Sequence, residues 1–428
     1  MEENVNRSLF AFIKNSPTAW HACACAAAAL EGAGFEELEE RAAWRLRPGG
    51  RYFVRRNGSA LLAFSLPEDF GGFLMWAAHT DSPCFLVKGE APAAGMYTRL
   101  SVEKYGGMLC ASWMDRPLSL AGRVTVREGE GLRTRLIDLD RDLLLIPSVA
   151  IHMDRTVNDG KKLDVNVDML PLLGSELAER RLARLTAEAA AVSEEDVVSS
   201  ELLVYSRTPG TIWGADGEYI SAPRLDDLQC VFAGLQGLLT AKPGTNAPLL
   251  CLFDNEEVGS GTRQGADSDF LASVLERICG SLGRDLRQTL AASFMVSADN
   301  AHAVHPNHPE YADRGDRPRM NGGVVIKRNA NRKYATDAIS AAVFEELCAR
   351  AGIPVQRYSN RPDLPGGSTL GNISGSHVSV PTVDIGHAQL AMHSAYETAG
   401  AADTETMIRA ARAYFESVYS EKDGKIRL

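Results

Sequence analysis

Residues 73–81 read FLMWAAHTD, a run of six apolar residues that ends in a histidine and, two positions later, an aspartate. A continuous apolar run of this length is typical of a strand that is buried on both faces of a sheet. Side chains at positions i and i+2 of an extended segment share a face, so Asp81 can orient the imidazole of His79. The stretch therefore predicts a central strand that carries a polar pair to the edge of the sheet.

Two further apolar runs end in polar clusters. The run LLCLF at 249–253 precedes DNEEVGS, which contains Glu256 and Glu257, and the run FMVSA at 294–298 precedes Asp299. Ligands of open α/β sheets bind outside the carboxyl ends of the strands. We therefore expect the three clusters to lie together at one edge of the sheet.

Strand-like and helix-like segments alternate over most of the chain, which predicts an α/β fold with a largely parallel mixed sheet covered by helices. The expected strands are 61–66, 73–78, 248–253, 294–298, 323–327, 354–359 and 382–385. Two helices are expected within 5–33, and others at 226–240, 271–282, 336–351 and 404–419. After residue 81 the pattern changes to short β-like segments separated by glycine and charged residues, among them 123–127, 133–139 and 202–205. We expect a discontinuous α/β domain of residues 1–88 plus 222–428 and an inserted β-rich domain of residues 89–221.

The composition excludes several classes of function. The net charge of -10 argues against a nucleic-acid partner, because phosphate binding needs a concentrated basic face. No apolar stretch is long enough to span a bilayer, and the start MEENVNRSLF lacks the order of a secretion signal, so we expect a cytoplasmic protein. The eight cysteines lack CxxC spacing and are expected to be reduced.

Each polar cluster also has an ordinary structural interpretation. Asp226 and Asp227 could be an N-cap and a first-turn charge, and adjacent glutamates usually belong to a solvated loop. Taken together with His393, however, the clusters supply two imidazoles and several carboxylates, the ligand set of a pair of zinc ions. The two glutamates diverge if their backbone is extended, so that one can bind metal while the other faces a bound water.

Six motifs, in chain order, resemble those of the M18 family of dinuclear-zinc aminopeptidases, the aspartyl aminopeptidases: AAHTDSPCF, SAPRLDDLQC, DNEEVGS, SADNAHAVHPN, VIKRNANRKYAT and QLAMHSAYET. The resemblance implies a zinc-peptidase fold and two zinc ions per subunit. It implies Glu256 as the general base and Asp81 as a partner of the metal site. The implied zinc ligands, with Asp226 bridging the two ions, are His79, Asp226, Glu257, Asp299 and His393.

The resemblance also implies how subunits and substrate are arranged. In the family, the β-rich insertion pairs subunits and covers the active site, so we expect a homo-oligomer, a dodecamer built from dimers. His152 matches a histidine that reaches a neighbouring subunit's substrate pocket. The loop PGGSTLG resembles a substrate-cradling turn, and its candidate substrate-binding residues are Gly367, Ser368 and Thr369.

The preference for the first residue of the substrate is a separate expectation. Lys327, Arg332 and Lys333 are candidate partners for the side-chain carboxylate of an N-terminal Asp or Glu. Two positions depart from the family pattern. Asn331 stands where some acid-preferring relatives have lysine, which leaves a neutral or apolar first residue open, and Asp227 stands where relatives commonly carry Asn.

The implied reaction is the release of the N-terminal residue from a peptide by a hydroxide activated by two zinc ions, with Glu256 accepting the proton. Cobalt or manganese could occupy one of the two metal positions, because such sites discriminate partly by availability. Two other classes remain open: another dinuclear-zinc amidohydrolase, such as a carboxypeptidase or a deacylase, and a non-enzymatic assembly protein with a vestigial site.

Overall fold

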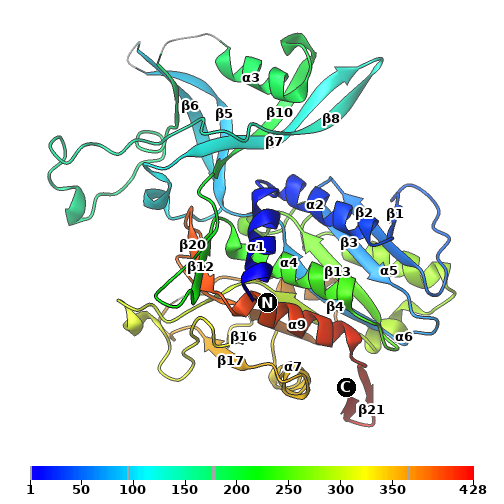
Figure 1. Ribbon diagram of the computed structural model, residues 1–428. Coiled ribbons are helices and arrows are strands. Elements are labelled where there is room, and N and C mark those ends of the chain that lie inside the picture. Colours follow the sequence, from blue (N-terminus) through cyan, green and yellow to red (C-terminus); the bar gives the residue numbers. More distant parts are fainter. Residues whose placement is uncertain (1, 94–95, 176–179, 365) are drawn as a thin grey trace.

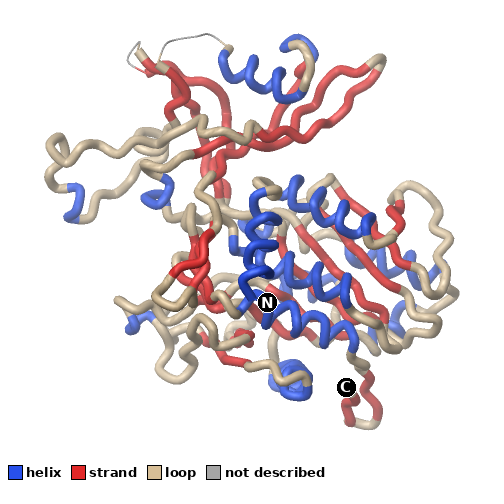
Figure 2. Tube along the Cα trace, viewed as in Figure 1, coloured by secondary structure: helices blue, strands red, loops and turns tan. Residues whose placement is uncertain are grey.

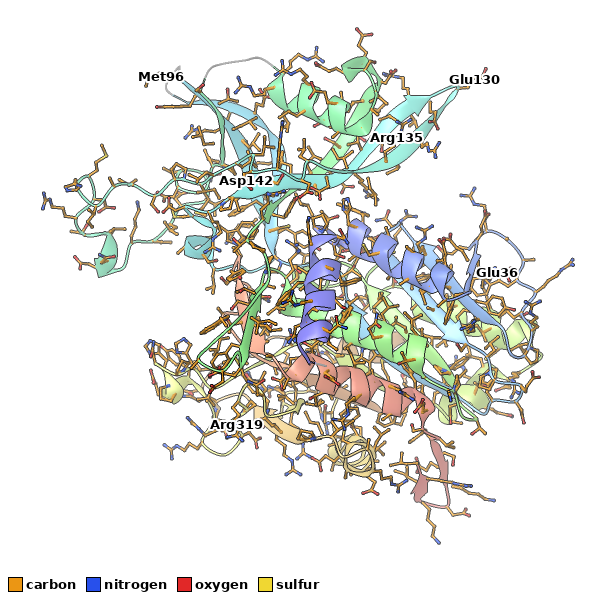
Figure 3. All side chains as sticks on the ribbon, viewed as in Figure 1. Glu36, Met96, Glu130, Arg135, Asp142 and Arg319 are labelled. Atoms are coloured by element: carbon orange, nitrogen blue, oxygen red, sulfur yellow. The ribbon has the colours of Figure 1, made fainter. Side chains whose placement is uncertain are left out.

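The protein consists of a larger body that contains both termini and a smaller body that stands on it (Figure 1). The computed structural model describes residues 2–93, 96–175, 180–364 and 366–428. Strands dominate the smaller body, whereas helices and strands alternate in the larger one (Figure 2). In the side-chain view, Met96 and Glu130 lie at the end of the smaller body that is remote from Glu36 and Arg319 on the larger body (Figure 3).

A nine-stranded sheet forms the centre of the larger body, in the order β1-β2-β3-β13-β4-β14-β18-β16-β17. Its central strands β13, β4, β14 and β18 are parallel, while β3 and β16 run antiparallel to their neighbours β13 and β18. The predicted α/β class with a largely parallel mixed sheet is confirmed. The strands are β1 (Glu36–Leu38), β2 (Arg51–Arg56), β3 (Ala60–Ser65), β4 (Phe73–His79), β13 (Ala247–Phe253), β14 (Phe294–Ala298), β16 (Val324–Arg328), β17 (Val355–Ser359) and β18 (Thr382–Gly386).

Helices cover both faces of this sheet, and each face has its own apolar core. One core lies under α2, α4, α7 and α9 and includes Trp76, which packs against Tyr414 and Phe415. The other lies under α5 and α8. All seven residues of β4 are buried, as expected for a strand covered on both faces. The helices are α1 (Glu2–Lys14), α2 (Ala19–Gly32), α4 (Leu225–Thr240), α5 (Phe270–Ser281), α6 (Leu286–Ala291), α7 (Ala338–Arg350), α8 (Leu370–His377) and α9 (Asp403–Glu416).

The smaller body is an antiparallel six-stranded sheet in the order β8-β7-β10-β5-β6-β9. Buried and exposed residues alternate along β6, so one face of this sheet packs on a core and the other meets solvent. Its elements are β5 (Cys84–Ala93), β6 (Tyr97–Tyr105), β7 (Leu118–Glu128), β8 (Gly131–Asp138), β9 (Leu172–Gly174), α3 (Arg181–Ala190) and β10 (Val197–Ser206). The exact limits of the two domains, 1–88 plus 222–428 and 89–221, stay a prediction.

A third sheet, in the order β11-β12-β20-β19-β15, was not expected from the sequence. Its strands have only two to four residues, too few for a periodic pattern to be recognised. They are β11 (Thr211–Trp213), β12 (Tyr219–Ala222), β15 (Ala301–His302), β19 (Ala388–Leu390) and β20 (Glu397–Gly400). The turn between β19 and β20 carries His393.

The remaining short elements are a C-terminal hairpin and five 3-10 helices among the described residues. They are β21 (Ser420–Lys422), β22 (Lys425–Arg427), η1 (Cys110–Trp113), η2 (Val157–Asp159), η3 (Glu194–Asp196), η4 (Glu256–Val258) and η5 (Pro309–Tyr311). None of the helices in the described part of the chain is long and apolar enough to cross a bilayer.

Candidate active site

Asp81 is the centre of a hydrogen-bond network at the end of β4. Its carboxylate accepts the backbone amides of Glu256 at 3.1 Å and Glu257 at 3.2 Å, and the hydroxyl of Tyr105 at 2.6 Å. The Nδ1 atom of His79 lies 3.1 Å from the backbone oxygen of Asp81 and 3.5 Å from its carboxylate. Asp81 therefore contacts the imidazole of His79 and also holds the glutamate turn beside it.

Asp226 lies between two imidazoles. Its Oδ1 is 3.4 Å from Nε2 of His79, and its Oδ2 is 3.4 Å from Nε2 of His393. The neighbouring Asp227 is fully buried, and its Oδ2 accepts the backbone amide of His79 at 3.1 Å. Arg224 is the N-cap residue of α4 and makes no side-chain capping bond. Both aspartates thus face the site, and neither serves as the N-cap of this helix.

Glu256 and Glu257 form a short helical turn, η4, and not the extended segment that the sequence suggested. The turn arises because Asn255 adopts a left-handed conformation, with φ of 61°, directly before it. Both glutamates nevertheless approach the site. Glu257 Oε2 lies 3.4 Å from Nε2 of His393, and one carboxylate oxygen of Glu256 lies close to His79 and Glu257.

Asp299 follows β14 and pairs with a buried lysine. Nζ of Lys327 is 3.4 Å from Oδ2 of Asp299, 2.7 Å from its backbone oxygen and 3.4 Å from the backbone oxygen of Asn300. Lys327 is only 2 % exposed. Its ammonium group is thus already engaged by the chain.

These side chains form overlapping groups of potential metal ligands, in each of which one atom per residue lies within 4.8 Å of the others. Asp226 belongs both to the group with His79, Asp227 and Asp299 and to the group with Glu257 and His393. A third group contains His79, Glu256 and Glu257. Two ligand sets that share one carboxylate are the arrangement that a bridged pair of metal ions needs.

The donor chemistry of the cluster fits zinc. Among the described residues, Oδ1 of Asp227 and Oε1 of Glu257 are buried without a hydrogen-bond partner. Buried carboxylate oxygens of this kind are costly unless they are paired or coordinate a metal. Imidazole nitrogen and carboxylate oxygen are both ordinary zinc ligands.

The pKa values of the side chains in the site reflect the presence of several buried carboxyl groups close together. Burial raises the pKa of Glu256 to about 8, and burial followed by repulsion from Asp226 raises that of Glu257 well above its ordinary value. Burial lowers the pKa of His393, but bonding to Asp226 and the charge of Glu257 outweigh it and raise the pKa to about 10. The site therefore holds more acidic groups than its own cations neutralise, which favours divalent cations.

Sequence reasoning missed two residues that hold this cluster. Glu397 is buried, and its carboxylate accepts the backbone amides of Asp226 at 2.9 Å and His393 at 2.7 Å. Tyr105 comes from the smaller body, and its hydroxyl joins Asp81 to the side-chain amide of Asn255, 2.8 Å away. Glu397 could have been noticed only as a further acid in the motif QLAMHSAYET, and no sequence pattern marks Tyr105.

The predicted substrate-binding residues lie in different surroundings. His152 is exposed on a loop of the smaller body. Arg332 and Lys333 line a surface hollow that also includes Arg361, and the guanidinium of Arg332 bonds the backbone oxygen of Thr336 at 3.3 Å. In the loop PGGSTLG, Pro365 lies outside the described residues. Gly367 has open space around it, Ser368 donates to Asn372 at 2.9 Å, and Thr369 is buried and donates to Asp384 at 2.6 Å.

The family assignment follows from comparison with known proteins. The family model described as aminopeptidase I zinc metalloprotease (M18) matches residues 12–415. The chain belongs to the M18 family. A probable M18 family aminopeptidase 2 from Clostridium acetobutylicum is 44 % identical over 411 residues, which cover 93 % of this chain and 95 % of the relative.

Solved structures agree with this assignment. Yeast aminopeptidase 1 is 28 % identical, covers 97 % of this chain and 97 % of its own, and superposes with a TM-score of 0.86. The mApe1 dodecamer of S. cerevisiae is also 28 % identical with a TM-score of 0.86, over 96 % of both chains. The predicted M18 membership and zinc aminopeptidase class are confirmed. The alternatives of a carboxypeptidase, a deacylase or a vestigial assembly protein are not supported.

Proposed function

We propose that this M18 aminopeptidase holds two zinc ions at the cluster around Asp226, and that His79 and Asp299 bind one ion while Glu257 and His393 bind the other. The observation that carries the proposal is the position of Asp226, whose two oxygens are each 3.4 Å from a different imidazole. Asp227 lies in the same group as His79, but one of its oxygens is already bonded to the backbone. This bond favours Asp226 as the bridging residue.

Zinc bound in this cluster would supply Lewis acidity, which lowers the pKa of water and polarises the carbonyl of the first peptide bond. We propose that Glu256 accepts the proton of the attacking water and delivers it to the leaving amine. Glu256 is placed for this role, because one of its carboxylate oxygens lies within 4.8 Å of the potential ligand atoms of His79 and Glu257. The negative charge of the acidic side chains in the site attracts the free ammonium group of the substrate. This attraction restricts cleavage to the first residue.

We further propose that Lys327 positions Asp299 and does not bind the substrate side chain, because its ammonium group already has three oxygen partners. A preference for an N-terminal Asp or Glu then rests on Arg332 and Lys333. The test compares aspartyl and leucyl p-nitroanilides with the parent and with Arg332→Ala and Lys333→Ala. A selective loss of aspartyl cleavage supports the preference, and an unchanged ratio of the two rates contradicts it.

For the quaternary structure we propose a homo-oligomer, with the dodecamer as the expected form. The dodecameric assembly of the S. cerevisiae relative supports this proposal. In this chain, apolar side chains on the loop between β8 and β9 are strongly exposed: Val149 47 %, Ile151 48 %, Met153 84 % and Val167 67 %. Exposed apolar patches of this kind are typical of contact surfaces. His152 stands among them, which supports its predicted role in a neighbouring subunit's pocket.

The metal and base assignments are tested together by zinc analysis and turnover. Glu256→Gln is expected to retain two zinc ions per subunit and to lose at least 100-fold in kcat, which is the range of general-base catalysis. His393→Ala is expected to lose zinc as well as activity. Glu276→Gln, an exposed glutamate on α5, is the matched control. Parental turnover in Glu256→Gln contradicts the base assignment, and full zinc content in His393→Ala contradicts the ligand assignment.

A further inference from the structure

Asp227, the neighbour of the proposed bridging residue, has a carboxylate oxygen without an assigned role. The residue is fully buried, and its Oδ2 accepts the backbone amide of His79 at 3.1 Å. Its Oδ1 is buried without a hydrogen-bond partner among the residues that the structure describes. Buried carboxylate oxygens are normally hydrogen-bonded or bound to a metal ion. The Oδ1 atom is therefore available to a ligand.

The thiol of Cys230 does not meet the requirement of this oxygen. It lies beside the Asp227 carboxylate, but a thiol is only a weak donor. Its sulfur is also 3.4 Å from the side-chain oxygen of Asn300 and 3.6 Å from Nδ1 of His387. The single hydrogen of the thiol thus has other acceptors, and Asp227 keeps an oxygen to offer.

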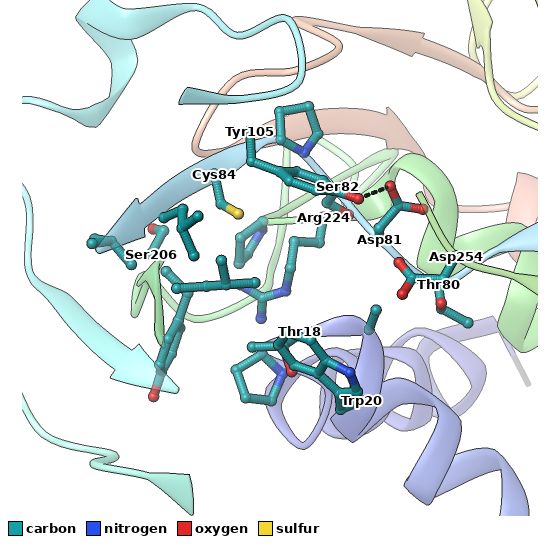
Figure 4. A pocket seen from close by; sticks show the side chains of 18 of the residues that line it. Thr18, Trp20, Thr80, Asp81, Ser82, Cys84, Tyr105, Ser206, Arg224 and Asp254 are labelled. Carbon is teal, nitrogen blue, oxygen red and sulfur yellow. Dashed lines mark hydrogen bonds between the residues drawn. The ribbon is translucent and has the colours of Figure 1, made fainter. Parts of the chain in front are cut away.

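Water in the neighbouring cavity does not meet it either. An enclosed cavity of about 200 Å³ lies beside the metal cluster, and Figure 4 shows the Tyr105 hydroxyl directed at Asp81 in its wall. Asp226 lines this cavity, whereas Asp227 does not. Water held there would not contact Asp227, and the residue has no surface exposed to bulk solvent.

The neighbours of Asp227 are proposed metal ligands. Asp227 belongs to the group with His79, Asp226 and Asp299, in which one potential ligand atom per residue lies within 4.8 Å of the others. All four residues are buried. Closed zinc sites have four protein ligands in a tetrahedral arrangement. The group therefore contains a complete set of ligands for one ion, provided that Asp227 is counted.

The other metal position has fewer ligands and is more open. Its group consists of Asp226, Glu257 and His393. The side chain of His393 is 32 % exposed, whereas that of His79 is 1 % exposed. Zinc sites with three protein ligands keep a position for water or substrate. The two positions are thus unequal, one closed and one open.

The charge of the buried position permits a third carboxylate. Nζ of Lys327 is 3.4 Å from Oδ2 of Asp299 and offsets the charge of that carboxylate. A divalent cation offsets the charges of Asp226 and Asp227. Buried charges persist when they are compensated in this way.

We propose that Oδ1 of Asp227 is a zinc ligand, which completes a closed position together with His79, Asp226 and Asp299. The ion at this position is held permanently, and the ion at the open position exchanges first. The inference rests on the two-zinc site proposed above and extends its set of ligands.

The direct test is a crystal structure of the zinc-loaded parental enzyme, with the ions located by their anomalous scattering. The Oδ1 atom of Asp227 is expected about 2.0–2.2 Å from the ion that binds His79. A distance beyond this range overturns the inference while two ions at Asp226 leave the proposed site intact. Ions located away from Asp226 overturn both, so the two failures are distinguishable.

Competition with a chromogenic chelator tests the ligand in solution. Asp227→Asn keeps the volume and the oxygen that accepts the His79 amide, but replaces the free oxygen by an amide nitrogen. The tighter of the two zinc-binding steps is expected to weaken more than about 100-fold, beyond the 10–100-fold effect of a residue that only orients a ligand. The weaker step should change little. A loss within or below the 10–100-fold range overturns the inference, because Asp227 would then only support His79.

Two control variants separate metal binding from other effects. Asp403→Asn also removes a buried carboxylate, which accepts the backbone amides of Asn321 at 2.7 Å and Gly323 at 3.2 Å outside the metal cluster. Cys230→Ala removes the thiol beside Asp227. Both are expected to keep the parental zinc affinity. A loss in Cys230→Ala as large as that in Asp227→Asn overturns the inference.

Cobalt(II) gives a readout that does not depend on activity. Its visible absorption responds to the number and type of its ligands, so the spectrum of the first cobalt ion bound is expected to change in Asp227→Asn and not in Asp403→Asn. An unchanged spectrum in Asp227→Asn overturns the inference. Circular dichroism checks the fold of each variant, and the crystal structure of the parent decides the matter even where Asp227→Asn fails to fold.

Discussion

The Tyr105 hydroxyl tests whether the smaller body helps to hold the metal site. Tyr105→Phe removes one oxygen that donates to the Asp81 carboxylate at 2.6 Å and accepts from Asn255 at 2.8 Å. A hydrogen bond to a charged group contributes about 1.5–3 kcal/mol. The loss falls on Asp81, which also holds the backbone amides of Glu256 and Glu257.

The expected result is a zinc affinity that is weaker by about 10–100-fold, the range seen when a partner of a metal ligand is removed. This range corresponds to about 1.4–2.8 kcal/mol and is therefore consistent with the loss of one charge-assisted bond. Competition with a chromogenic chelator measures the affinity. Activity at saturating zinc should recover most of its parental value, because Tyr105 does not belong to the cluster of potential ligands.

Tyr205→Phe is the matched control. The Tyr205 hydroxyl makes the same kind of bond, 2.7 Å to the carboxylate of Asp138, but both residues lie away from the cluster. Any general effect of losing a tyrosine–carboxylate bond should appear in both variants. Equal zinc affinity of Tyr105→Phe and Tyr205→Phe would refute the reasoning, because the smaller body would then cover the site without supporting it.

Three further predictions concern single substitutions, at His387, Gly386 and Met153. Burial lowers the pKa of His387 to about 3, so below pH 6.5 the unfolded chain binds a proton that the native state does not bind. The free energy of unfolding should therefore fall by about 1.4 kcal/mol per pH unit from pH 6.5 towards the folded pKa. Urea unfolding at pH 7.5 and 5.5 should show this difference in the parent and not in His387→Asn. A Cβ at Gly386 would lie 1.9 Å from the backbone oxygen of Asp299. Gly386→Ala should therefore destabilise the protein by about 1–3 kcal/mol and reduce its zinc content. Parental zinc content in this variant would contradict the prediction. Met153→Asp should reduce the assembled fraction in analytical ultracentrifugation, whereas Leu132→Asp, which changes an apolar side chain 66 % exposed on β8, should leave it unchanged.

Sequence alone predicted the parts of the site that follow long apolar strands. The runs before His79, Glu256 and Asp299 match β4, β13 and β14 closely, because strands buried on both faces leave a continuous apolar pattern. Parallel strands bring their carboxyl ends to one edge, so the convergence of these clusters could also be anticipated. The order of the six motifs then identified the family without any coordinates.

Only the tertiary structure decided which neighbours hold those residues. Tyr105 reaches Asp81 from another body, and Glu397 joins His393 to Asp226 across 171 residues of sequence, through bonds that leave no periodic signal. The same applies to Lys327, whose residue type suggested a substrate contact but whose position beside Asp299 engages its charge. Sequence thus determined which chemical groups are present and at which sheet edge they emerge, because apolar periodicity is local. The pairing of each group was decided by packing, because it depends on contacts between distant segments.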